Sequence, residues 1–286
     1  MTTITASMVK ELRDITGSGM MECKKALQES QGDVQIAIDN MRKNGQLKAA
    51  KRASRVAAEG VVMIAASNDG NVCCMTEINC ETDFVARDAS FKAFSDMMTK
   101  AGLSIKANDV PALMSTHDAA REALVAKVGE NIQVRRVATV SSAGCVGCYI
   151  HGDRIGVLVA LDKKNLELAK DIAMHIAATN PAAIDADGVA PELLAKEREI
   201  VTAQAKSSGK PDNIIEKMVD GRLQKFVKEI CLVHQPFVKN PDVTVQSLLT
   251  AAGAKVLKFV RFEVGEGIEK PVSDLAAEVN ATLKDA

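Results

Sequence analysis

Hydrophobic residues recur at helical spacing through residues 1–45 and predict three short helices. In "TASMVKELRDITGSG", Met8, Val9 and Leu12 share one helical face, and the glycines that follow tolerate the positive φ that ends a helix. "MMECKKALQES" predicts the second helix. "GDVQIAIDNMRKNG" predicts the third, with Asp33 as its N-cap and Gly45 as its end. Because a module of this length buries little core of its own, we expect it to pack against a partner.

Residues 46–59, "QLKAAKRASRVAAE", combine good helix formers with few large apolar residues. The basic side chains are Lys48, Lys51, Arg52 and Arg55. We interpret the segment as a solvated helical linker. A basic patch that binds RNA is the alternative.

Alternating and β-branched runs dominate residues 60–190. "VVMIAASNDGNVCCMTEIN" is a hairpin pattern around an Asn-Asp-Gly-Asn turn. The helix pattern that follows has Phe91, Phe94 and Met98 on one face. Three further β-like runs, "NIQVRRVATV", "GCVGCYIHG" and "DRIGVLVAL", precede the helix pattern "NLELAKDIAMHIAAT". This order predicts an α+β fold of two subdomains with antiparallel sheets, 60–143 and 144–190.

Residues 191–229 predict an antiparallel helical hairpin, because two long charged segments are joined by a short connection. Its narrow apolar stripe is typical of a coiled-coil arm and consists of Leu194, Ile200, Ile214, Ile215, Met218 and Phe226. The strand pattern "AKVLKFVRFEV" within 230–265 indicates a return to the second subdomain, which makes the hairpin an insertion. Residues 266–286 form a C-terminal module with a predicted final helix, "SDLAAEVNATLKD".

The charge balance argues against nucleic-acid binding over a broad surface. Lysine plus arginine number 36 and aspartate plus glutamate 37, so no general basic field attracts a phosphate backbone. No signal-peptide pattern and no apolar run long enough to span a bilayer is present, so we expect a cytoplasmic protein that does not bind membranes. Seven cysteines, an odd number, suit a reducing compartment.

"CVGC", Cys145 to Cys148, is the sharpest apparent motif. A zinc site needs about four ligands, and only His151 follows, although Cys73 and Cys74 could complete a site across a sheet. A redox pair normally begins a helix, whereas β-like residues surround this one. Ordinary strand residues are the favoured interpretation, and a thiol or zinc protein is the competing one.

Other candidate chemistry is sparse. "GSGMMECKK" lacks the spacing of a phosphate loop, so we expect no direct nucleotide binding. His175 follows Asp171 by one helical turn, where a structural pair or a core histidine is favoured over catalysis. These patterns identify no catalytic residue, and we expect no metal site and no cofactor.

"TDFV", residues 82–85, permits two interpretations. In the first, slightly favoured, Phe84 packs under its own helix as a hydrophobic staple while Thr82 or Asp83 caps that helix. In the second, Phe84 is a wedge presented to a partner, beside an acid that could disturb a cation site. Met20 and Met21 are similarly open, because flexible thioethers serve equally as core filler or as an adaptable binding surface.

Several blocks, taken together and in order, resemble the elongation factor Ts family. They are "TASMVKELRDITGSGMMECKKAL", "INCETDFVARD", "GENIQVRR", "HGDRIGVLV", "MHIAA", "QPFVKNP" and "RFEVGEGIEK". The resemblance runs from Ile4 to Lys270. It implies a guanine nucleotide exchange factor for elongation factor Tu that promotes GDP release by disturbing the magnesium and phosphate site of that GTPase. By the same resemblance, we expect no enzyme activity on a covalent bond.

The resemblance also assigns expected contacts. The first module is similar to ubiquitin-associated folds and docks on a helix of the GTPase domain through Met20 and Met21, with Val9 behind them. Thr82, Asp83, Phe84 and Val85 match the segment that displaces magnesium in the partner.

Two further contacts follow from the same resemblance. His151 matches a position that faces the second half of elongation factor Tu. The helical hairpin matches the dimerisation arm of the family, which implies a homodimer.

Overall fold

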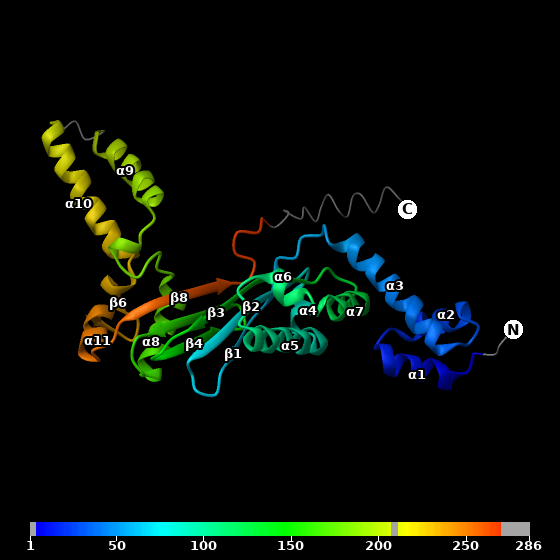
Figure 1. The fold of residues 1–286 in the computed structure, drawn as a ribbon. Helices are drawn as coiled ribbons and strands as arrows, with labels where there is room; N and C mark the ends of the chain where they lie inside the picture. The colour runs from blue at the N-terminus through cyan, green and yellow to red at the C-terminus, as the bar shows by residue number, and fades with distance from the viewer. Residues whose placement is uncertain (1–3, 207–210, 270–286) are drawn as a thin grey trace.

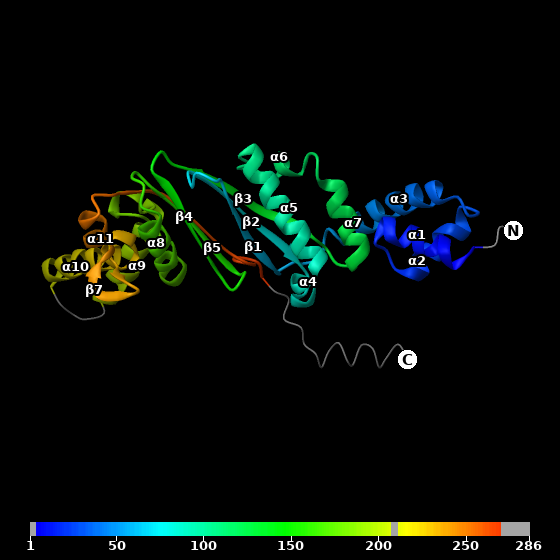
Figure 2. The same cartoon turned by 90° about the horizontal axis from the view of Figure 1, so that it is seen from below.

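The computed structural model describes residues 4–206 and 211–269. Three helices stand at one end, two small sheets with their helices form the middle, and a helical hairpin projects near the other end (Figures 1 and 2). The predicted α+β class is confirmed. The predicted final helix and the hairpin turn at 207–210 lie outside the described residues. Within the described ranges, no helix is long and apolar enough to cross a bilayer.

The N-terminal module consists of α1 (Ala6–Thr16), α2 (Met20–Glu29) and α3 (Val34–Arg52). Gly17 ends α1 with a φ of +66°, as the glycine-rich turn predicts. The Asp33 carboxylate caps α3 by accepting a hydrogen bond from the Ile36 amide at 2.9 Å. The buried residues of this small core are Val9, Leu12, Cys23, Ala26, Leu27 and Ala37.

The expectation that α3 ends at Gly45, with a separate helical linker from residue 46, is wrong. The helix continues through Gly45 to Arg52 because good helix formers follow and Gly45 keeps a helical backbone. A Cβ at Gly45 would lie 3.6 Å from that of Ala126 on α7, an ordinary van der Waals distance, so α3 and α7 pack against each other at this position. One continuous helix therefore joins the module to the rest of the chain.

The first sheet has the antiparallel order β1-β2-β3, with β1 (Glu59–Ala66), β2 (Val72–Cys80) and β3 (Gln133–Ser141). Between β2 and β3 the chain forms α4 (Asp83–Arg87), α5 (Ala89–Ile105), α6 (Val110–Met114) and α7 (Asp118–Val128). Helix α5 lies along one face of the sheet (Figure 2). It buries Phe91, Phe94 and Met98 there, as its apolar spacing predicts.

The second sheet has the antiparallel order β4-β5-β8, with β4 (Cys145–His151), β5 (Ile155–Leu161) and β8 (Val256–Glu263). Helix α8 (Leu166–Thr179) covers its outer face. The 3-10 turns Ala186–Gly188 and Leu232–His234, strands β6 (Pro236–Phe237) and β7 (Asn240–Thr244), and α11 (Val245–Ala251) flank the hairpin in sequence. Strand β8 follows the hairpin yet pairs with β5, so the hairpin interrupts this subdomain.

The two sheets pack face to face. The shared layer includes Val62 and Met75 from the first sheet and Leu158 from the second. A Cβ at Gly156 would lie only 2.4 Å from Val62, so this close approach requires glycine. At the edge of the layer, the fully buried Glu77 carboxylate pairs with Arg135 and Arg136 of β3 and accepts from the Gly265 amide after β8.

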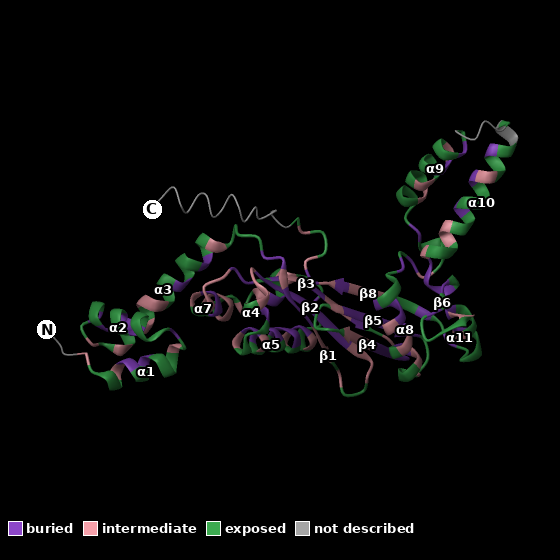
Figure 3. Ribbon diagram, turned by 180° about the vertical axis from the view of Figure 1, so that it is seen from behind, coloured by how far each residue is buried: buried purple, intermediate pink, exposed green. Residues whose placement is uncertain are grey.

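The hairpin consists of α9 (Pro191–Lys206) and α10 (Asp212–Ile230) and is largely exposed (Figure 3). Its predicted stripe is partly wrong, since Ile200 and Ile214 are exposed. The residues buried between the helices are Val201, Ala205, Ile215, Val219 and Leu223. On each helix the buried face therefore includes the residue after the exposed isoleucine, Val201 on α9 and Ile215 on α10.

Candidate functional site

Phe84 stands on the surface at the start of α4. Its side chain is 81% exposed, whereas Ala86 is buried and Val85 packs against the core of the first subdomain. The staple interpretation is therefore wrong for Phe84. The helix is capped by Thr82, whose hydroxyl accepts from the Val85 amide at 3.4 Å.

Thr82 is fixed by a carboxylate 48 residues away, that of Glu130. The Thr82 hydroxyl donates to Glu130 Oε1 at 2.6 Å, and the amides of Glu81 and Thr82 donate to Oε2 at 3.1 and 3.0 Å. From the other side, the Cys80 thiol donates to the Thr82 carbonyl at 3.1 Å. Burial, with Glu130 nearby, raises the pKa of Cys80 to about 12, so this thiol remains a donor.

Glu130 is a residue that the sequence patterns did not single out. It lies in "GENIQVRR", a block that carried resemblance but no assigned chemistry. The only sequence signal was an acid directly after Gly129, the left-handed C-cap of α7. Nothing in local periodicity connects that position to "TDFV".

A second carboxylate completes the junction. Glu81 accepts from the Asn131 amide at 2.7 Å and pairs with Arg55 at 3.4 Å. The Asn131 side chain donates to the Arg55 carbonyl at 2.8 Å. The segment bearing Phe84, the loop after α7 and the turn after α3 thus meet at one place.

Asp83, beside Phe84, pairs with Arg87 one turn later at 2.9 Å. Both side chains are at least half exposed, so solvent screens this pair and it stabilises the helix little. The Asp83 carboxylate is consequently accessible to a partner.

Met20 and Met21 lie on the surface at the start of α2, with 60% and 74% exposure. Val9 is buried in the core beneath, so it supports this surface instead of forming it. Of the two open interpretations, the exposed one holds.

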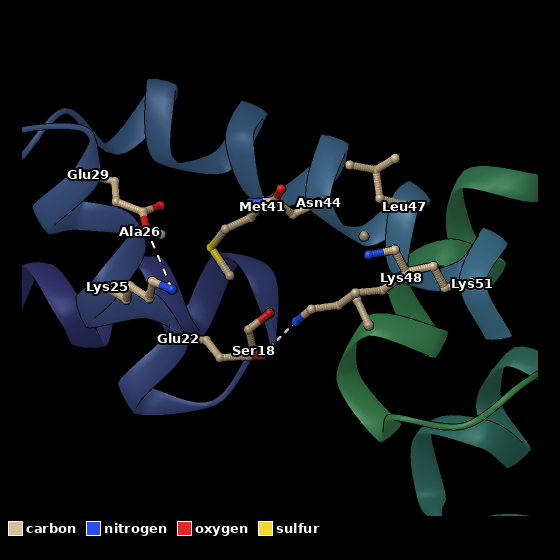
Figure 4. Close-up of a pocket in the computed structure, with 12 residues that line it drawn as sticks. Ser18, Glu22, Lys25, Ala26, Glu29, Met41, Asn44, Leu47, Lys48 and Lys51 are labelled. Atoms are coloured by element: carbon tan, nitrogen blue, oxygen red, sulfur yellow. Dashed lines mark hydrogen bonds and ion pairs between the residues drawn. The ribbon is translucent and has the colours of Figure 1, made fainter.

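A pocket of about 390 Å³ lies along α2 and α3 of the same module (Figure 4). Lys48 crosses it to pair with Glu22 at 2.8 Å, and Met41 and Leu47 contribute apolar wall. The module therefore presents apolar and charged groups together.

His151 is exposed at the end of β4, where its Nδ1 lies 3.2 Å from the Tyr149 hydroxyl. The structure does not gather His151, Phe84 and the two methionines into one pocket. They occupy β4, α4 and α2, and α2 stands in the N-terminal module, apart from the sheets (Figure 1). Such a distribution suits an extended contact with a macromolecule.

The "CVGC" cysteines do not form a pair. Cys145 faces α8 and donates to the Lys163 carbonyl at 3.3 Å, whereas Cys148 packs in the layer between the sheets. There the Cys73 thiol and, less strongly, Lys170 lower the pKa of Cys148 to about 7. Among the residues that the structure describes, no three His, Cys, Asp or Glu side chains are grouped to hold a metal ion.

His175 is a core histidine, as favoured from the sequence. Its Nε2 lies 2.9 Å from Gln235 Oε1, and its Nδ1 accepts from the Val238 amide at 3.2 Å. Burial lowers its pKa. Asp171 pairs with Lys239 at 2.6 Å, so the alternative pairing of Asp171 with His175 is wrong.

The chain is similar to known proteins over nearly its whole length. A family model described as elongation factor TS matches residues 81–266. A protein named elongation factor Ts from Thioalkalivibrio sulfidiphilus is 56% identical to this chain, and the match covers 99% of this chain and 100% of the relative. A protein of the same name from Alcanivorax borkumensis is 54% identical, and the match covers 97% of this chain and 100% of the relative. The relative of the same name in Hahella chejuensis is 56% identical, with 99% and 100% covered.

Proposed function

The chain belongs to the elongation factor Ts family, the nucleotide exchange factors of elongation factor Tu, and we propose that it drives exchange by inserting the Phe84 ring near the magnesium site of that GTPase. The observation that carries this proposal is the exposure of Phe84 on a firmly held base. A ring that is mostly exposed contributes little to the stability of the free chain, and aromatic residues are enriched among the side chains that dominate binding energy.

The neighbouring residues take complementary roles. Asp83 approaches the basic groups and the cation around the nucleotide, where a second negative charge disturbs the magnesium coordination. Thr82 fixes the start of the segment, and Val85 attaches it to the core.

Exchange of this kind needs no nucleophile. GDP is held by a phosphate loop and Mg²⁺, so a protein that binds the nucleotide-free GTPase more tightly lowers GDP affinity. The coupling is reciprocal, and GDP or GTP weakens binding of the factor by the same ratio. We therefore propose that the chain catalyses no chemical reaction.

The remaining surfaces supply affinity and geometry. Met20 and Met21 dock the N-terminal module on a helix of the GTPase domain, and His151 contacts the other half of the partner. The helical hairpin mediates a homodimer. We thus propose a docking module that includes all of α3, two core subdomains and an inserted helical arm. We also propose that the chain acts in the cytoplasm.

Release of a fluorescent GDP analogue from elongation factor Tu tests the function. A substoichiometric amount of the chain, added with excess unlabelled GDP, is expected to raise the release rate in proportion to its concentration. An unchanged rate would refute the exchange activity.

A further inference from the structure

We propose that Glu130 is a positioning residue that sets the direction in which the Phe84 ring leaves the surface. This inference rests on the proposed role of Phe84 and adds a residue outside the "TDFV" segment. It acts through Thr82, two residues before the ring.

Every polar group of Thr82 has a partner, which leaves its backbone little freedom. Glu130 accepts from both its amide and its hydroxyl, and the Cys80 thiol and the Ala86 amide donate to its carbonyl at 3.1 and 3.2 Å. Hydrogen bonds to a carboxylate are about twice as strong as those between neutral groups. Glu130 is therefore the strongest of these constraints.

The loop that carries Glu130 is itself fixed. The neighbouring Asn131 is buried, and its side chain donates to the Arg55 carbonyl while its amide donates to Glu81. The same loop ends α7, against which α3 packs at Gly45. A chain of contacts therefore connects Thr82, at the base of the Phe84 segment, through Glu130 and α7 to α3, the helix of the docking module.

Helix α4 cannot set the direction of the ring alone. It has five residues, of which only Ala86 is buried, and so short a helix is unstable by itself. Without Glu130, Phe84 would sample several directions, and each encounter with the partner would have to restore the productive one. Pre-organisation of this kind raises affinity by reducing the ordering that binding requires.

A double-mutant cycle in the GDP-release assay tests this. Glu130→Ala is expected to slow exchange about tenfold with Phe84 present, the effect of losing charged hydrogen bonds. In a Phe84→Ala background the same change is expected to have almost no further effect, because no ring remains to be positioned. Equal effects in both backgrounds, or no effect of Glu130→Ala in either, would overturn the inference.

The two proposals can fail separately. If Phe84→Ala slows exchange and Glu130→Ala does not, the wedge stands and the positioning role is refuted. If Phe84→Ala leaves exchange unchanged, the wedge is refuted, and so is any positioning role that depends on it, whatever Glu130→Ala does.

Rescue and control variants separate positioning from general stability. Glu130→Gln keeps an acceptor for the two amides and an amide group that can donate to the Thr82 hydroxyl, so it is expected to restore most of the rate. Glu167→Ala, at an exposed position on α8, is the matched control and should exchange normally. If Glu130→Ala does not fold, Thr82→Val removes the hydroxyl of the same contact, and a normal rate for it would refute the inference.

Discussion

Phe84 and Val85 are consecutive residues with opposite environments. Phe84 is 81% exposed, whereas Val85 packs against the core of the first subdomain. The start of α4 at Asp83, directly after the Thr82 cap, directs adjacent side chains to different sides. This arrangement separates a contact residue from an anchoring residue within one short segment.

Thermal and urea unfolding of Phe84→Ala and Val85→Ala test whether Phe84 is a contact residue and Val85 an anchoring residue. Phe84→Ala is expected to change the free energy of unfolding by less than about 0.5 kcal/mol, because its ring buries little. Val85→Ala is expected to lower it by about 1 kcal/mol through lost packing. A large loss of stability in Phe84→Ala would show that the ring is part of the core.

Met20→Ala/Met21→Ala should weaken the complex with nucleotide-free elongation factor Tu about tenfold, because exposed thioethers at an interface contribute buried apolar area. Titration calorimetry measures the dissociation constant. Leu257→Ala, at an exposed position on β8, is the matched control and should bind normally. In the exchange assay, the methionine variant should need more factor for half-maximal rate and reach the same maximum.

Glu77→Ala should lower the free energy of unfolding by about 3 kcal/mol, because the half-buried Arg135 loses its carboxylate and the half-buried Arg136 keeps only its pair with Glu266. Urea unfolding at neutral pH measures this loss. Glu216→Ala, on the exposed side of α10, should differ from the unsubstituted chain by less than about 0.5 kcal/mol. An equally small effect of Glu77→Ala would contradict the role of the buried carboxylate in joining the sheets.

Because His175 is buried, we expect the folded chain to lose stability in mild acid. Its Nδ1 accepts a hydrogen bond from the Val238 amide, so a proton on Nδ1 would face that N–H group. Burial also lowers the pKa of the folded ring below 6.5. Below pH 6.5 the unfolded chain binds a proton that the folded chain does not, so stability falls as pH falls, until the folded ring also titrates.

The limiting slope of this effect is about 1.4 kcal/mol per pH unit. His175→Gln, which cannot titrate, should lose this component when unfolding is compared between pH 7.5 and 5.5. Identical pH slopes for the two proteins would contradict the assignment.

The sequence patterns predicted most of the local structure because caps, turns and periodicity are local. Gly17 and Asp33 act as expected, while Gly45 does not, because it keeps a helical backbone and good helix formers follow it. The C-x-x-C spacing of Cys145 and Cys148 is typical of a paired site, but side chains alternate along a strand, so the two thiols lie on opposite faces of the sheet.

The candidate site was predicted only in part. The residues of "TDFV" slightly favour the staple, whereas the family resemblance favours the wedge, and only the burial of each side chain in the folded chain distinguishes the two. Glu130 was missed because its contact with Thr82 spans 48 residues, and no local pattern encodes such a contact.

The most direct test is stopped-flow release of a fluorescent GDP analogue from elongation factor Tu at saturating concentrations of the unsubstituted chain and of Phe84→Ala. We predict that the unsubstituted chain accelerates release strongly, and that Phe84→Ala, although folded and bound, loses about tenfold or more of that acceleration. Equal maximal rates for the two proteins would contradict the account.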